Sequence, residues 1–594
     1  MYKQMEGFSF MKVLVIVVIV VYDGLNNKKD YLIKQYLIFV GGNIKMKKMV
    51  FVVFLSILSI TMLTACGGND KDNSQSSSSA DEKLEVLNLS VPAELPTVDP
   101  ALVQDAISFN ALNQVMEGLY RLDQKGNPIP AAADGEAEVS EDGLTYTFKL
   151  KPNLVWSNGD AVTAADFEFG WKRVVDPKTA ANYAFIMKDV KNAQKIMDGT
   201  VASEELGIKA MDELTLEVKV EKPTENFLTT ITRGTFFPQN EKFVKKEGEQ
   251  FGTNSERAIY NGPFVLTEWD GTGLSWNYEK NPSYWDKKNV SLDKVTNQVI
   301  KEATTGINLY ENDTIDLVRL TGEQAKQYID NPEFKAPLEA RSVYLELNQI
   351  DHPALKNQKV REAIALTINR EDLVKMIIAN GSEALGGLVT NDLAKNTETK
   401  EDFRKASGSY LDYDAKKAKA LWTEAQKELG SSTAEIELVT DDDETSKKVS
   451  QFIQSSIEAE LEGIKVKIRN VPFKNRIELG DTGQFGLLLS GWGADSNDPD
   501  AFLNLFLSDS VFNGGKYKNQ EYDKLVIAAT GEDSSDPNKK WADDLAAEKL
   551  LMQDVGIVPL YQKADSMLLK SKVKDYIQYQ IGSPNLKYVS IQED

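Results

Sequence analysis

Residues 434–471 have the pattern strand, helix, strand, and this order constrains the fold more than any other feature of the chain. Alternating apolar residues predict strands at 434–440 and 465–471, and the apolar spacing of 445–460 predicts an amphipathic helix between them. A helix that joins two strands is typical of parallel pairing, because parallel strands need a long crossover connection. The segment therefore predicts a parallel α/β unit.

Strands and helices are mixed through the rest of the chain as well. The same patterns predict further strands at 84–91, 144–150, 214–220, 264–269 and 274–279, and further helices at 109–119, 164–175, 359–379 and 413–429. The chain has 594 residues, which exceeds the size of one ordinary domain, and it contains no internal repeat. We therefore expect an α/β protein of several domains.

The residues before position 84 have the composition of a targeting segment. A basic start at 46–48, an apolar run at 49–62 and small residues before Cys66 are typical of a secretory signal. With Cys66 at the cleavage point, 46–65 resembles a bacterial lipoprotein signal peptide, in which the Cys is acylated, for example with palmitate, and becomes the mature N-terminus. The polar stretch 66–83 predicts a flexible tether, so we expect a soluble body held at a membrane surface.

Residues 1–45 do not suit a position in front of such a signal. Their apolar stretch 13–21 is too short to cross a bilayer. Gly41-Gly42-Asn43, just before Met46, can be encoded by a purine-rich ribosome-binding site. Our hypothesis is that translation begins at Met46 and that 1–45 is a translation-start artefact, which peptides from 1–45 in the unprocessed protein would disprove.

The composition excludes several classes of chemistry. The chain has one Cys and one His, so an internal disulfide and a Cys/His zinc site cannot form. A nucleophilic triad would depend on His352, which precedes Pro353 and is expected in a loop. The formal charge of -22 repels phosphate backbones, which argues against nucleic-acid partners.

Several short motifs occur in a fixed order over about 84–591. They lie at 98–100 and 116–119, 156–160 and 163–167, 261–264 and 280–285, 360–364 and 369–370, and 491–495 and 498–499. Together they resemble the oligopeptide and dipeptide group of solute-binding protein family 5, the peptide-binding lipoproteins of bacterial ABC importers. The segment Gly-Trp-Gly-Ala-Asp at 491–495 is the most specific of them.

The resemblance implies an α/β fold like that of the periplasmic binding proteins, in which two lobes close on a ligand by a hinge. Lobe I would comprise 84–124, 259–339 and 564–594, an extra domain II would comprise 125–258, and lobe III would comprise 340–563. The implied function is that of a monomeric receptor, lipid-anchored at the outer face of the cytoplasmic membrane as in Gram-positive bacteria. It would capture oligopeptides and deliver them to an ABC permease with its ATPase, with no enzymatic activity, cofactor or metal.

The resemblance also assigns ligand-binding residues. A receptor that ignores peptide sequence must recognise the peptide backbone and its charged ends. In the family, the residue that matches Asp495 pairs with the peptide ammonium, while Gly491 and Gly493 would leave room for pairing between main chains. The other implied residues are the facing loop Gln104, Asp105 and Ala106, the pocket aromatics Phe169, Phe473 and Trp492, and, near further aromatic positions, Tyr344 and Tyr561.

One departure from the family concerns the carboxyl end of the ligand. Some relatives bind it with basic side chains in lobe III, where this chain has Leu489, Met376 and Ile378. We therefore expect a weakly anchored peptide carboxylate and tolerance of peptide length. Lys375 and Arg476 are near enough in sequence to act as substitutes.

Other functions remain open on the sequence. The same fold could serve a signalling pheromone peptide, a haem, a sugar or a nickel chelate, although the single His disfavours direct nickel ligation. A secreted carboxylate-dependent enzyme such as a glycosidase needs only two acids. However, no pair of acids stands out, and no glycine-rich phosphate loop is present.

Overall fold

The computed structural model describes residues 84–224 and 226–592 of the chain. The start-site segment 1–45, the signal segment 46–65, Cys66 and the tether 66–83 lie outside the described residues, so the predictions made for them stay predictions. In the part of the chain that is described, no helix is long and apolar enough to cross a membrane.

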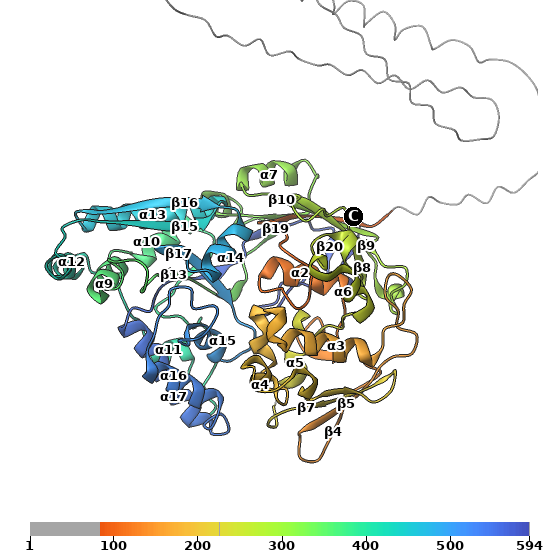
Figure 1. Ribbon diagram of the computed structural model, residues 1–594. Helices are drawn as coiled ribbons and strands as arrows, with labels where there is room; N and C mark the ends of the chain where they lie inside the picture. The colour runs from red at the N-terminus through yellow and green to blue at the C-terminus, as the bar shows by residue number, and fades with distance from the viewer. Residues whose placement is uncertain (1–83, 225, 593–594) are drawn as a thin grey trace, which may run out of the picture. The chain divides into compact units, whose positions relative to one another are not determined.

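A seven-stranded mixed sheet draws its strands from separate stretches of the chain (Figure 1). Its order is β12 (Phe334–Lys335), β19 (Met567–Leu569), β11 (Leu317–Arg319), β1 (Val86–Val91), β10 (Lys294–Val299), β9 (Ser275–Lys280) and β8 (Phe264–Thr267). The predicted strand pair 264–269 and 274–279 is confirmed as the antiparallel hairpin of β8 and β9. The predicted strand 84–91 is confirmed as β1, which lies parallel to β10.

A six-stranded mixed sheet forms the second large layer. Its order is β14 (Glu383–Ala384), β18 (Ile557–Ala564), β13 (Leu338–Leu347), β17 (Leu487–Gly493), β15 (Ala434–Asp441) and β16 (Ile464–Val471). β15 and β16 are parallel and are joined through α13 (Glu444–Glu460), which confirms the strand–helix–strand prediction.

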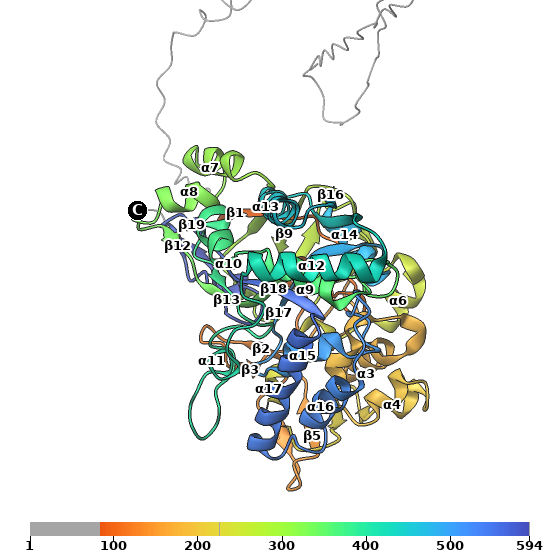
Figure 2. The ribbon, with the colours of Figure 1, turned by 90° about the vertical axis from the view of Figure 1, so that its left-hand side faces the viewer.

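Helices cover both faces of the six-stranded sheet (Figures 1 and 2). Because side chains alternate along a strand, Val343 and Leu345 of β13 enter one core, with α9 (Gln358–Leu366), α12 (Ala415–Leu429) and α13. Ala340 and Tyr344 enter the other, with α16 (Gln520–Thr530) and α17 (Pro537–Gln553).

Smaller elements complete the described chain. A four-stranded sheet has the order β4 (Glu138–Val139), β5 (Thr145–Lys149), β7 (Thr215–Lys219), β6 (Ile208–Ala210), and two hairpins pair β2 (Tyr120–Leu122) with β3 (Pro128–Pro130) and β20 (Val573–Lys574) with β21 (Ser590–Ile591). The remaining α-helices are α2 (Ala106–Val115), α3 (Ala164–Val175), α4 (Ala193–Met197), α5 (Phe227–Thr230), α6 (Glu241–Glu247), α7 (Ala303–Glu311), α8 (Gly322–Gln327), α10 (Arg370–Asp372), α11 (Phe403–Ser407), α14 (Phe473–Asp481) and α15 (Asp500–Leu503).

Two short connections link the large sheets, one between β12 and β13 and one between β18 and β19. They lie side by side, because Leu338 pairs with Ala564 and the Asp565 N–H donates to the Pro337 carbonyl oxygen at 2.9 Å. Paired adjacent connections of this kind can act as a hinge, since few backbone torsions have to change.

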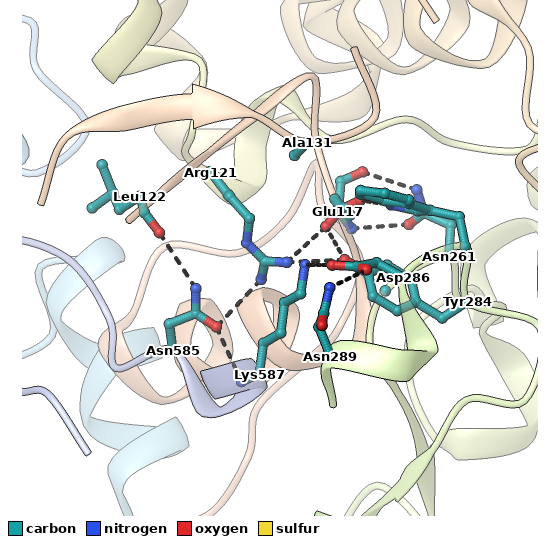
Figure 3. Close-up of polar contacts among 12 residues, drawn as sticks. Glu117, Arg121, Leu122, Ala131, Asn261, Tyr284, Asp286, Asn289, Asn585 and Lys587 are labelled. Atoms are coloured by element: carbon teal, nitrogen blue, oxygen red, sulfur yellow. Dashed lines mark hydrogen bonds and ion pairs between the residues drawn. The ribbon is translucent and has the colours of Figure 1, made fainter. Parts of the chain in front are cut away.

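Several of the family motifs converge in a buried polar network (Figure 3). Glu117 accepts hydrogen bonds from Arg121 at 2.8 Å and from the Tyr284 hydroxyl, and Asn261 bonds the Glu117 backbone in both directions. Lys587, near the C-terminus, pairs with Asp286 at 2.6 Å. Hydrogen bonds and ion pairs of these motifs therefore join distant stretches of the chain. This gives the motifs a role in folding.

Two predicted helices differ from the structure. The helix predicted over 359–379 is interrupted: α9 ends at Leu366, Asn369 caps α10, and a π-helical turn follows at Leu373–Ile378. The hydroxyl of Thr367 and the side chain of Asn369 bond to the backbone and so compete with helix continuation. The helix predicted over 109–119 begins earlier, at Ala106, because Asp105 caps it.

Candidate functional site

A cavity of about 510 Å³ takes its walls from both large sheets. Strands β1 and β11 contribute from one sheet, and β13, β17 and β18 contribute from the other. Nine of the eleven residues predicted to bind ligand line this cavity, namely Gln104, Asp105, Ala106, Tyr344, Phe473, Gly491, Trp492, Gly493 and Tyr561. The other two, Asp495 and Phe169, are not part of the lining.

Asp495 lies at the edge of the cavity, just beyond the end of β17. Its Oδ2 accepts a hydrogen bond from the Tyr183 hydroxyl at 3.3 Å, and its main-chain oxygen accepts one from Arg233 Nη2 at 2.5 Å. Both partners line the cavity. Burial raises the pKa of the Asp495 carboxyl, and the nearby cations Arg233 and Lys188 only partly oppose this. A further cation at this carboxylate would therefore be stabilising.

Strand β17 borders the cavity with one edge unpaired. β13 pairs with the whole of β17, whereas β15 pairs only with its first two residues. Leu489 to Gly493 all line the cavity, so their outer edge faces it without a strand partner in the described chain. Such an edge can add an extended segment through main-chain hydrogen bonds. An alanine Cβ at Gly491 would also lie 3.2 Å from the Ser342 carbonyl oxygen, a tight contact that would require β13 to shift slightly.

Aromatic rings from distant segments meet beside Asp495. Trp492 stacks on Tyr183 with ring centroids 5.8 Å apart, and Phe512 meets Trp492 edge-on at 4.7 Å. Phe109 of α2 packs on Tyr183 at 5.0 Å. Sequence reasoning missed Tyr183, Arg233 and Phe512, because Tyr183 lies in a short 3-10 helix and the other two lie in turns, where no periodic pattern marks them.

The other predicted aromatics lie in two different environments. Tyr344 and Tyr561 are buried in the cavity wall, and Phe473 begins α14. Phe169 is only half-buried and does not reach the cavity, because α3 directs Phe167 and Trp171 into the core instead. No direct role in the cavity is therefore apparent for Phe169.

The polar side chains of the loop at 104–106 form hydrogen bonds with other residues of the protein. Gln104 Nε2 donates to Asp481 of α14 at 2.8 Å, which joins two walls of the cavity. The Asp105 carboxylate caps α2 by accepting from the Ser108 N–H at 2.9 Å. What this loop can offer a ligand is therefore mainly its backbone.

The positions expected to leave the ligand carboxylate unanchored are separated in the structure. Leu489 and Ile378 line the cavity, whereas Met376 is 69% exposed. Lys375 is exposed and pairs with Glu371. Arg476 lines the cavity but already pairs with Asp441 at 3.2 Å. Of the two substitutes named from the sequence, only Arg476 is therefore placed to meet a ligand.

Metal ligation has no geometric support in the described residues, since they contain no group of three or more His, Cys, Asp or Glu side chains that could hold an ion. His352 lies outside regular secondary structure, as predicted, with its Nε2 3.0 Å from the Glu435 carbonyl oxygen.

The fold and the cavity between the two large sheets together define a substrate-binding protein. A solved structure described as OppA of Listeria monocytogenes bound to peptide has 38% sequence identity, covers 86% of this chain and 99% of its own, and has a TM-score of 0.83. A solved pheromone receptor, PrgZ, has 37% identity, covers 86% of this chain and 100% of its own, and has a TM-score of 0.82.

Sequence comparison identifies the family. The model for bacterial extracellular solute-binding proteins, family 5, matches residues 127–514. The dipeptide-binding protein of Lactococcus lactis subsp. cremoris is 35% identical over 543 residues, which are 89% of this chain and 96% of the relative. The chain therefore belongs to family 5 of the bacterial extracellular solute-binding proteins, which confirms the resemblance inferred from its motifs.

Proposed function

We propose that this protein captures oligopeptides in its cavity and delivers them to an ABC permease for uptake. The unpaired edge of β17 carries the proposal, because it offers main-chain groups that suit a ligand of any sequence. Asp495, which follows this strand and has a raised pKa, is the group we assign to the ligand ammonium. The peptide-bound relative from Listeria supports the same ligand class.

We assign the seven-stranded sheet to lobe I and the six-stranded sheet to lobe III, with domain II at 125–258. The strand bounds support this division, since β8 to β12 and β19 fall within the lobe I ranges and β14 to β17 fall within 340–563. β13 and β18 cross the boundaries of lobe III by two residues and by one residue. The two adjacent connections near Leu338 and Ala564 would form the hinge. Side-chain contacts that cross the cleft, such as Lys188 with Asp500 at 3.4 Å, would hold the closed form.

A lipid on Cys66 would hold the receptor at the outer face of the cytoplasmic membrane, next to its permease and ATPase. The Cys at the end of a short apolar segment and the polar tether after it support this part of the proposal. We assign the protein no catalytic role, because its family is one of solute-binding proteins.

Mass spectrometry of ligands released by denaturing the purified protein tests the proposal. A mixture of peptides is the expected result, and it supports a nutrient receptor. A single peptide sequence supports the pheromone-receptor alternative, for which the similarity to PrgZ is the specific observation. A non-peptide ligand, or failure of all peptides to bind in calorimetric titration, would refute peptide capture.

A further inference from the structure

Four carboxylates gather around a single guanidinium in the cavity wall. They belong to Asp105 at the start of α2, Glu346 on β13, Asp441 at the end of β15 and Asp481 at the end of α14, and all four line the cavity. The guanidinium is that of Arg476, whose charge acts on each of the four. Its Nε pairs directly with Asp441 at 3.2 Å.

Glu346 lies on a strand that faces the cavity. It is the most deeply buried of the four acids, with 4% of its surface exposed. Its Oε2 accepts a hydrogen bond from the Gly515 N–H at 3.2 Å, and the Ser490 hydroxyl also bonds to it. Burial raises the pKa of Glu346 to about 7. The charge of Asp481 adds to this rise, while the two hydrogen bonds and Arg476 oppose it only in part.

Asp481 and Asp105 also accept hydrogen bonds mainly from uncharged donors. Asp481 accepts from the side-chain amides of Gln104 at 2.8 Å and Asn182 at 3.3 Å, and Asp105 accepts from the Ser108 N–H. Burial raises the pKa of both carboxyls. Lys516 opposes the rise at Asp481, but it is not part of the cavity wall. This part of the cavity therefore holds more negative charge than its own cations balance.

We propose that this part of the cavity, the Glu346 pocket, binds a basic side chain of the captured peptide, the ammonium of a lysine or the guanidinium of an arginine. The inference rests on the proposed function and adds a substrate preference to it. A desolvated carboxylate is costly unless a cation accompanies it, and a ligand cation would supply the missing charge. An apolar side chain at the same place would leave the free-energy cost of desolvating the carboxylates uncompensated.

The strand register indicates which ligand residue reaches this pocket. Glu346 pairs with Leu488, whereas Arg341 pairs with Gly493, close to Asp495. Five residues of strand span about 17 Å, at about 3.3 Å per residue. A peptide anchored at Asp495 and extended along β17 advances at a similar rate. Five such steps place the sixth ligand residue level with Leu488 and Glu346, and a long lysine or arginine side chain can reach back by one or two residues. The basic residue therefore lies at about the fourth to the sixth position.

A set of alanine hexapeptides with one substituted position tests the proposal. Each of positions one to six carries lysine or its uncharged analogue norleucine, and binding is measured by calorimetry at about pH 8. For the wild type we expect lysine to bind at least tenfold more tightly than norleucine at one of positions four to six, and less than threefold more tightly at position one. Glu346→Gln should reduce the preference to less than threefold, and Asp481→Asn should also reduce it. Glu302→Gln, which removes a cavity-wall carboxylate outside the pocket, should keep it.

Proton release gives a second readout. Because a ligand cation would lower the pKa of Glu346, the wild type should release more protons near pH 7 on binding the lysine peptide than on binding the norleucine peptide. Any release that accompanies ammonium binding at Asp495 is common to both peptides. The charged and titratable groups that act on Glu346 here are Arg476, Asp481 and Tyr344. Glu346→Gln should abolish most of this difference.

The outcomes separate this inference from the proposed function. If neither peptide binds the wild type, the peptide-receptor proposal itself fails. If both bind with equal affinity at every position, the receptor proposal stands and the Glu346 pocket is refuted. If Glu346→Gln binds neither peptide, Asp481→Asn decides, and an unchanged lysine preference in that variant overturns the inference.

Discussion

Replacing Asp495 with alanine should weaken peptide binding strongly. The Asp495 carboxylate has one neutral hydrogen-bond donor, Tyr183, and burial raises its pKa, so a bound ammonium would be its main charged partner. Removing one member of a desolvated charge pair costs roughly 2–5 kcal/mol, because the other charge is left buried without a partner. That corresponds to a loss of affinity of roughly thirtyfold to several thousandfold.

Calorimetric titration with matched free and N-acetylated peptides measures this effect. Acetylation removes the ammonium, so it should cost the wild type about as much as Asp495→Ala does, and it should cost the variant little. Asp509→Ala, at an exposed acid that does not line the cavity, is the matched control and should behave as the wild type does. Binding by the wild type should also weaken as the pH falls through the raised pKa of Asp495, because protonation removes the charge. Equal affinity of the wild type for free and acetylated peptides would refute the assignment.

Three further predictions follow from the sequence and the site. Cys66→Ser should abolish lipidation, and finding mature-sized protein still at the membrane in cell fractionation would contradict the anchor. Amidation of the peptide carboxyl end should change affinity by less than about tenfold, or about 1.4 kcal/mol. A large loss of affinity in calorimetric titrations at every peptide length would reveal a basic anchor, with Arg476 the first candidate. Burial raises the folded-state pKa of Glu346 from 4.5 to about 7, so its favourable contribution to stability is full below about pH 4.5 and is lost as the pH rises through 7. Glu346→Gln should therefore reduce the difference in unfolding free energy between about pH 5 and pH 8 by on the order of 2 kcal/mol, and urea titrations that show an unchanged difference would contradict this.

The sequence by itself determined the local elements and the family. The alternation at 434–440 and 465–471 and the helical spacing between them became β15, α13 and β16, because side-chain periodicity is a local property of strands and helices. The sequence predicted helix ends less well where side chains compete with the backbone for hydrogen bonds. The helix break at Thr367 and Asn369 was missed for that reason. The ordered motifs identified the family, although the buried network of Glu117, Arg121 and Tyr284 indicates that some of them serve folding.

Only the tertiary structure decided which residues share the cavity. Tyr183 meets Trp492, and Gln104 meets Asp481, because packing joins segments that are far apart in the chain, and no local pattern encodes such a meeting. The same holds for the charge around Glu346, since four acids from four separate elements share one guanidinium only once the elements are assembled. The cost of burying a charge depends on how far water and opposite charges are removed from it, and both are fixed by the folded arrangement rather than by the order of residues.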